Sequence, residues 1–232
     1  MSPAPVTHVI FDFDGLLVDT ETAYTVAHTQ LLKEYGKTFT MELKRGQMGQ
    51  KEDASIVWLL KQVGLEGTVD PKEYQQKFSV LLHTLFRDCK ALPGAERLVR
   101  HLIAKGVPVA LCTGSCSKSY PIKSEKHTAW LDLIPLKVLT GDDPEVTHGK
   151  PHPQPFQVTM KRFATQPESP AKCLVFEDSY NGVLSGLAAG MQVVMVPDEN
   201  VYKPEGEFKS NVTQILESLE DFKPEDFGLT PF

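Results

Sequence analysis

Apolar residues along this chain follow two different patterns, which predict two kinds of structure. Between about residues 20 and 91 they recur every three or four positions, as they do along one face of a helix. Three such runs occur: Tyr24, Ala27, Leu31, Leu32 and Tyr35; Ile56, Leu59, Leu60 and Val63; Tyr74, Phe78, Leu81, Leu82 and Leu85. We therefore expect residues 20–91 to form a separate helical unit, with its aromatic side chains mainly in its core.

The rest of the chain alternates helices with short, continuously apolar segments. These segments have the length of buried strands, and they span residues 8–13, 107–113, 136–140, 173–176 and 192–196. Continuous apolar strands separated by helices are typical of a parallel sheet that is covered on both faces. The sequence therefore predicts a doubly wound parallel α/β core, formed by residues 1–19 and 92–232, into which the helical unit is inserted.

Composition limits the kinds of molecule that this protein is expected to bind and the compartment in which it is expected to act. The 232 residues carry a net charge of -6, which argues against a nucleic-acid-binding surface, and they include no apolar run long enough to cross a membrane. Residues 1–6 lack the basic and apolar regions of a secretory signal, and the four cysteines form no Cys-x-x-Cys pair. We therefore expect a cytoplasmic protein with reduced thiols that acts on a small molecule. We also expect a monomer, because the core and the helical unit together build a complete site.

The first apolar strand ends in two carboxylates and a glycine, Asp12, Asp14 and Gly15. Carboxylates are seldom buried unless they are paired or bound to a cation, so this arrangement indicates a metal site or a nucleophile. Gly15 allows the backbone to turn directly after the two carboxylates. We therefore expect them to be placed differently and to have different roles.

Other polar side chains follow the predicted strands in the same way: Thr113 to Ser115, Asp142 and Asp143 leading to Lys150, and Glu177 and Asp178. Ligands of doubly wound sheets bind at the carboxyl ends of the strands. Carboxylates gathered there would repel one another without a divalent cation, and all-oxygen ligation favours Mg²⁺. Since Lys150 and the Thr113 hydroxyl can hold an anion, the set fits phosphoryl transfer.

Four segments, in chain order, resemble the motifs of the haloacid dehalogenase superfamily. They are Phe11-Asp12-Phe13-Asp14-Gly15, Leu111-Cys112-Thr113-Gly114-Ser115, Gly149-Lys150-Pro151 and Val175-Phe176-Glu177-Asp178-Ser179. The resemblance covers almost the whole chain. It implies a Rossmann-like core with an inserted helical cap, a phosphatase activity and Mg²⁺ as cofactor.

The resemblance also implies roles for the motif residues. Asp12 would attack phosphorus to form an aspartyl-phosphate, and Asp14 would be the general acid and base. The residues expected to bind the phosphate are Thr113, Gly114, Ser115 and Lys150. The residues expected to hold Mg²⁺ are Asp12, Asp14 through its backbone carbonyl, Asp178, and Glu177 either directly or through a neighbouring ligand.

Three further segments, residues 141–146, 172–178 and 189–197, resemble the animal pseudouridine-5'-phosphatase group within this superfamily. This narrower resemblance implies pseudouridine 5'-phosphate as substrate, with sugar or polyol phosphates as the alternative. Tyr24 and Lys51 are the candidate substrate contacts from the helical unit.

Three other activities fit the sequence less well. A dehalogenase would not need Asp14, and a related phosphosugar mutase would carry histidine where this chain has Tyr24. A catalytically silent binding protein would need neither Asp12 nor Asp14.

Overall fold

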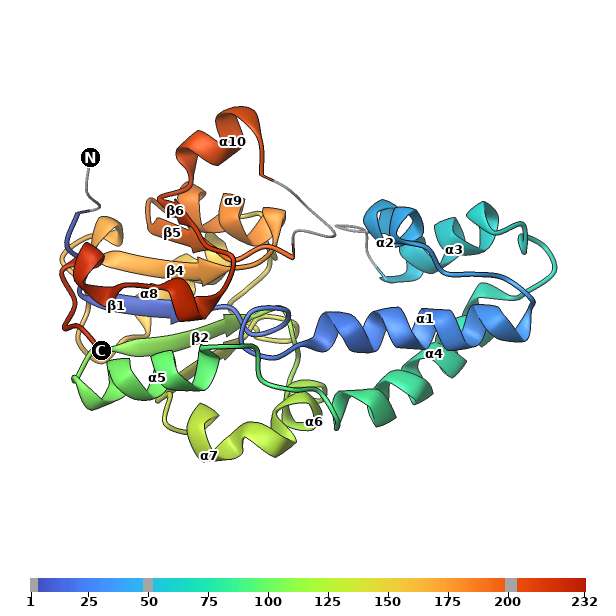
Figure 1. Ribbon diagram of the computed structural model, residues 1–232, viewed down its shortest axis with the longest axis horizontal. Helices are drawn as coiled ribbons and strands as arrows, with labels where there is room; N and C mark the ends of the chain where they lie inside the picture. Colours follow the sequence, from blue (N-terminus) through green and yellow to red (C-terminus); the bar gives the residue numbers. More distant parts are fainter. Residues whose placement is uncertain (1–3, 48–51, 199–203) are drawn as a thin grey trace.

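The computed structural model describes residues 4–47, 52–198 and 204–232, and its sheet has six parallel strands in the order β3-β2-β1-β4-β5-β6 (Figure 1). The strands are β1 (His8–Phe11), β2 (Val109–Thr113), β3 (Leu136–Leu139), β4 (Cys173–Glu177), β5 (Gln192–Met195) and β6 (Gln214–Ile215). Five of them overlap the predicted strands. The sequence does not predict β6, because two residues are too few to show an apolar pattern.

Helices cover both faces of the sheet. Helices that pack on it include α5 (Ala95–Ala104), α8 (Gln154–Lys161) and α9 (Tyr180–Ala188). Phe11 of β1 belongs to the same buried cluster as Leu98 of α5, whereas its neighbour Ile10 belongs to a second cluster with Phe156 of α8. Successive strand residues point to opposite faces, so β1 is buried on both. The predicted doubly wound α/β fold is confirmed.

Four helices lie together to one side of the sheet (Figure 1). They are α1 (Thr20–Glu34), α2 (Met41–Gln47), α3 (Glu52–Gln62) and α4 (Pro71–Phe86). The sequence does not predict α2, because none of its residues is buried and it therefore lacks an apolar stripe. The core of this group is aromatic, as expected: His28 stacks on Phe78 with ring centroids 4.1 Å apart, and Tyr74 is fully buried beside them.

Local signals fix the start and the end of α1. The Asp19 carboxylate accepts a 3.0 Å hydrogen bond from the backbone N–H of Thr22, which is the usual side-chain cap of a helix N-terminus. Gly36, with φ of +66°, follows the last turn and takes the left-handed conformation that glycine tolerates. Because α1 begins so soon after β1, its first turns lie close to the loop that carries Asp12 and Asp14.

The remaining elements are short. They are α6 (Tyr120–Ser124), α7 (Thr128–Leu131) and α10 (Gly206–Asn211), with 3₁₀ segments η1 (Glu125–His127), η2 (Pro170–Lys172), η3 (Leu219–Asp221) and η4 (Pro224–Phe227). Within the described ranges, no helix combines the length and the apolar content needed to cross a membrane.

Candidate active site

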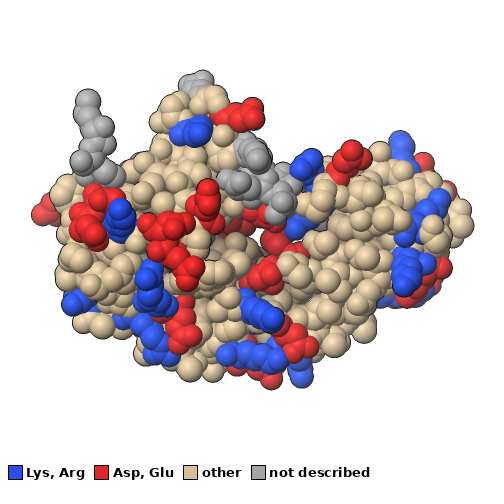
Figure 2. Space-filling model, viewed as in Figure 1, with Lys and Arg blue, Asp and Glu red and all other residues tan. Residues whose placement is uncertain are grey.

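Strand order reverses at β1, which lies between β2 and β4. Doubly wound sheets bind ligands at such a switch point, beyond the carboxyl ends of the strands. Asp12 directly follows β1, Thr113 ends β2 and Glu177 ends β4. The fold therefore brings three of the predicted polar clusters together. Figure 2 shows acidic side chains at the junction between the sheet and the α1–α4 helices.

Asp12 lies in a buried ion-pair network centred on Lys150. The Lys150 ammonium donates to Asp12 Oδ1 and to Glu177 Oε1, both at 2.5 Å, and to the backbone carbonyl of Cys112 at 3.1 Å. All three of its N–H groups are therefore used. The second Glu177 oxygen, Oε2, accepts hydrogen bonds from the backbone N–H and the hydroxyl of Ser179. Lys150 thus fixes the two carboxylates relative to each other.

Two glycines give the carboxylates room. A Cβ atom on Gly182 of α9 would lie 1.9 to 2.1 Å from the carboxylate atoms of Glu177. A Cβ atom on Gly15 would lie 2.4 Å from Asp178 Oδ2, and Gly15 also has a φ of +77°. Any side chain at either position would have to displace a carboxylate of the site.

The charges of this network are unbalanced. Burial raises the pKa of Asp12 to about 7, and repulsion from Glu177 adds to the rise although Lys150 opposes it. Burial, together with the charges of Glu177 and Asp12, raises the pKa of Asp178 well above its usual range. Burial alone would lower the pKa of Lys150, but Asp12 and Glu177 raise it well above its ordinary value. The protein groups therefore leave negative charge uncompensated.

The same residues fit a divalent cation. Asp12, Glu177 and Asp178 each offer a carboxylate oxygen, and these atoms lie within 4.8 Å of one another. Among the described residues, Lys150 is the only cation within ion-pair distance of the three carboxylates. Three negative charges against one positive charge leave an excess that a divalent ion would neutralise. An all-oxygen donor set favours Mg²⁺ over zinc.

Asp14 lies in a second network, formed around a lysine that no sequence motif indicates. Lys123 of α6 donates a 2.6 Å hydrogen bond to Asp14 Oδ1, and the hydroxyls of Thr113 and Ser115 donate to Oδ2 at 3.0 and 2.8 Å. Burial acts to raise the pKa of Asp14, but Lys123 and these hydrogen bonds outweigh it, so that the pKa is lowered. The different surroundings of Asp12 and Asp14 therefore shift their pKa values in opposite directions.

Other predicted residues lie apart from these networks. Asp142 accepts hydrogen bonds from Ser117, and Asp143 forms an ion pair with Arg162, so the expectation that both carboxylates join the cluster is wrong. Lys51 lies outside the described residues. Gly114 is exposed, and no atom lies within 4 Å of its Cβ position, so the backbone beside Thr113 is open.

Tyr24 lies at the junction of α1 and α4. Its ring centroid is 5.4 Å from that of Phe86 and 5.8 Å from the Lys123 ammonium.

Glu21, one turn before Tyr24, lies beside Gly15, and its carboxylate is 3.5 Å from the Lys44 ammonium; burial raises the pKa of Glu21. Sequence reasoning missed both Glu21 and Lys123. The start of α1 directly after the Asp14 loop signals the position of Glu21, whereas a single lysine in a short helix gives no signal of burial.

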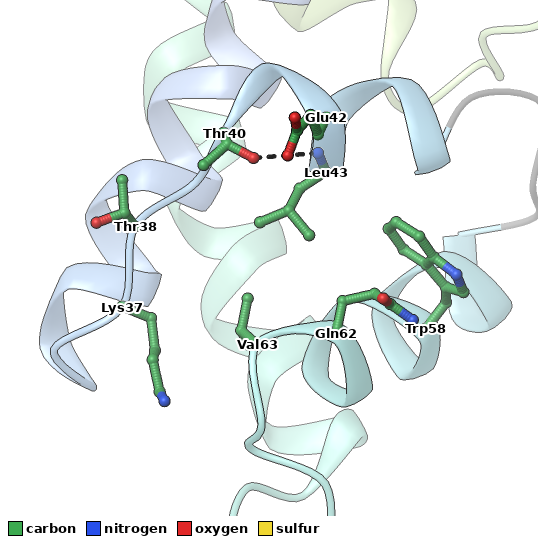
Figure 3. Close-up of a pocket in the computed structure, with 8 residues that line it drawn as sticks. All are labelled: Lys37, Thr38, Thr40, Glu42, Leu43, Trp58, Gln62 and Val63. Atoms are coloured by element: carbon green, nitrogen blue, oxygen red, sulfur yellow. Dashed lines mark hydrogen bonds between the residues drawn. The ribbon is translucent and has the colours of Figure 1, made fainter.

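A pocket of about 490 Å³ lies within the α1–α4 helices (Figure 3). Leu43 and Val63 point toward each other across it, and Trp58 lies at one end. Thr40 caps α2 there, its hydroxyl accepting a hydrogen bond from the backbone N–H of Leu43 at 3.3 Å. None of the predicted site residues lines this pocket.

The fold and the two networks agree with the comparison to known families. The family model of haloacid dehalogenase-like hydrolases matches residues 9–196, and this chain belongs to that family.

Two similar sequences are named as phosphatases. The chain is 44% identical to a probable pseudouridine-5'-phosphatase of Drosophila melanogaster, over 98% of this chain and 96% of that protein. It is 39% identical to (DL)-glycerol-3-phosphatase 2 of Arabidopsis thaliana, over 98% of this chain and 93% of that protein. A solved haloacid dehalogenase family hydrolase from Deinococcus radiodurans, with bound phosphate and sodium, matches with a TM-score of 0.80 and 26% identity, covering 99% of this chain and 100% of the other.

Proposed function

We propose that this protein is a magnesium-dependent phosphatase that hydrolyses a small phosphate monoester through an aspartyl-phosphate on Asp12. The single observation that carries the proposal is the network in which Lys150 holds Asp12 and Glu177 at 2.5 Å, next to Asp178. The names of relatives at 44% and 39% identity support phosphatase activity, as does the phosphate bound by the hydrolase of Deinococcus radiodurans.

Two displacements would complete the reaction. In the first, an oxygen of Asp12 attacks phosphorus while the bond from phosphorus to the leaving oxygen breaks, and Asp14 gives that oxygen a proton. In the second, Asp14 takes a proton from water, whose oxygen attacks phosphorus and breaks the bond to Asp12, so that inorganic phosphate is released. Asp12 and Asp14 accept hydrogen bonds from separate sets of donors, so each carboxylate can be positioned independently for its own step.

The side chains of Asp12 and Asp178 and the backbone carbonyl of Asp14 would hold Mg²⁺. When bound, the ion neutralises charge and aligns the phosphoryl group with the nucleophile. Glu177 already accepts hydrogen bonds at both oxygens, from Lys150 and from Ser179. We therefore assign Glu177 mainly to orienting Lys150 beside the metal site.

The phosphoryl oxygens need hydrogen-bond donors. Lys150 and the hydroxyls of Thr113 and Ser115 lie around the two carboxylates, and the backbone at Gly114 is open. Charged and preorganised donors of this kind stabilise the charge that develops on a transferred phosphoryl group. All these groups belong to one chain, which supports catalysis by a monomer.

Pseudouridine 5'-phosphate is the proposed substrate, since the relative at 44% identity is named for this ester. Two relatives at 40% and 39% identity are named glycerol-3-phosphatases, so a polyol phosphate is the second candidate. The α1–α4 helices would act as a cap that contacts the part of the substrate beyond the phosphate. Tyr24, at the junction with Lys123, and Lys51 are the proposed contacts from this cap.

The test is phosphate release in Mg²⁺ from pseudouridine 5'-phosphate, uridine 5'-phosphate, glycerol 3-phosphate and sugar phosphates. We expect kcat/KM to be highest for pseudouridine 5'-phosphate, by about 10-fold or more, because a site built to hydrogen-bond one base discriminates against others. A preference for glycerol 3-phosphate would replace this substrate with the polyol alternative. If no ester is hydrolysed, the phosphatase proposal itself is refuted.

A further inference from the structure

Lys123 is a buried cation outside the four sequence motifs. Only 5% of its side chain is exposed, although it belongs to a helix of five residues, Tyr120–Ser124. Lysine is almost never buried to this extent unless it is paired, because desolvating an ammonium is unfavourable. The contacts that offset this cost therefore indicate what the side chain does.

Those contacts converge on Asp14. The ammonium donates to Asp14 Oδ1 at 2.6 Å and to the Ser115 hydroxyl at 2.9 Å, and that hydroxyl in turn donates to Asp14 Oδ2. The Thr113 hydroxyl also donates to Oδ2. Both oxygens of the Asp14 carboxylate are thus held at the same time, so its two side-chain torsions are fixed.

Two aromatic rings also lie close to the ammonium. The Lys123 Nζ atom lies 4.6 Å from the ring centroid of Phe86 and 5.8 Å from that of Tyr24. These rings come from the end of α4 and the start of α1, where the helical unit joins the sheet. Rings at these distances attract the cation and keep water from it. Within the described part of the chain, the ammonium donates its hydrogen bonds to Asp14 and Ser115.

We propose that Lys123 is a positioning residue for the reaction, and that it acts by holding the Asp14 carboxylate in place for proton transfer. The inference rests on the proposed function, in which Asp14 protonates the leaving oxygen and then takes a proton from water. In this role Lys123 acts through Asp14 and not directly on the phosphoryl group. A displacement of about 1 Å in such a group costs on the order of 100-fold in rate, so its orientation determines the rate.

Measuring the two displacements separately distinguishes a positioning role of Lys123 from a purely structural one. An aryl phosphate with a good leaving group, such as 4-nitrophenyl phosphate, needs little protonation of its leaving oxygen, so the first displacement survives when Asp14 is misplaced. The second displacement still needs Asp14 to take a proton from water. We therefore expect Lys123→Met to release one equivalent of 4-nitrophenol per site in a burst, followed by steady-state turnover at least about 10-fold slower than wild type.

A matched control and a double variant complete the test. Lys126→Met, which removes a lysine that pairs with the exposed Asp88, should behave as wild type. If Lys123 acts only through Asp14, the Lys123→Met/Asp14→Asn protein should be as slow as Asp14→Asn alone, within about 2-fold. If Lys123→Met does not fold, Lys123→Gln carries the same comparison, because its shorter amide cannot hold the carboxylate in the same place.

Two results would overturn the inference. One is a Lys123→Met protein whose first and second displacements slow equally, with no burst. The other is a double variant that is much slower than Asp14→Asn, since Lys123 would then act on another group. Wild-type protein that hydrolyses no phosphate ester would instead refute the proposed function, so the two failures are distinguishable.

Discussion

The buried histidine among the α1–α4 helices makes stability depend on pH. His28 is 6% exposed, its ring stacks on Phe78, and its Nδ1 atom lies 3.1 Å from the Tyr74 hydroxyl. Burial lowers the pKa of His28 to about 4 from its ordinary value of 6.5. Between these two values the unfolded chain binds a proton at this position and the folded protein does not. The full free energy of unfolding is therefore present above pH 6.5. The part of it that depends on a neutral His28 is lost as the pH falls from 6.5 toward 4.

The size of the effect follows from the shift. One pKa unit corresponds to about 1.4 kcal/mol, so a shift from 6.5 to about 4 corresponds to at most about 3 kcal/mol. At pH 5 only part of this range has been crossed, and the expected loss relative to pH 7.5 is about 2 kcal/mol. Partial opening of the ring to water would reduce this value.

The assay is denaturant unfolding of wild type and His28→Phe at pH 7.5 and pH 5, followed by the tryptophan fluorescence of Trp58 and Trp130. Phenylalanine does not titrate, so the stability of wild type relative to the variant should fall by about 2 kcal/mol at pH 5. Using this difference removes the contribution of the active-site carboxylates, which both proteins share. His83→Gln, on the exposed side of α4, is the matched control. An equal difference between wild type and His28→Phe at both pH values would refute the reasoning.

Three further outcomes are expected. A chelator should stop hydrolysis and Mg²⁺ should restore it, with Ca²⁺ a poor substitute, and Asp178→Ala should raise the Mg²⁺ concentration required; full activity in excess chelator would contradict this. Gly182→Ala should lower kcat at least about 10-fold, because its Cβ would lie 1.9 to 2.1 Å from the Glu177 carboxylate; unchanged kcat would contradict it. Tyr24→Leu should change kcat/KM for the natural substrate more than for an aryl phosphate, and equal losses would assign Tyr24 to packing alone.

The parallel sheet and part of the site could be predicted from the sequence. Strands buried on both faces are continuously apolar, so β1 and β4 are visible without the structure. Asp12 and Glu177 each follow such a strand, and the ends of neighbouring parallel strands meet. Their convergence therefore follows from topology and needs no knowledge of side-chain contacts.

Other parts of the site depend on information that a local pattern lacks. Asp143 follows β3, which β2 separates from β1; since neighbouring strands lie about 4.8 Å apart, β3 ends about 10 Å to the side of β1, and Asp143 pairs with Arg162 instead of joining the cluster. The spacing of apolar residues predicts where strands occur in the chain, but it does not predict their order in the sheet. Lys123 is buried against groups that lie far from it in sequence, among them Asp14 and Phe86.

The phosphorylated state of Asp12 is the most direct test of the proposed reaction. Protein mixed with Mg²⁺ and substrate is quenched in acid during turnover, digested, and mapped by mass spectrometry. We expect one phosphoryl group on the peptide containing Asp12, and no phosphoryl group and no turnover in a folded Asp12→Asn protein. Phosphate on another residue, or turnover by Asp12→Asn at the wild-type rate, would contradict the assignment of Asp12 as the nucleophile.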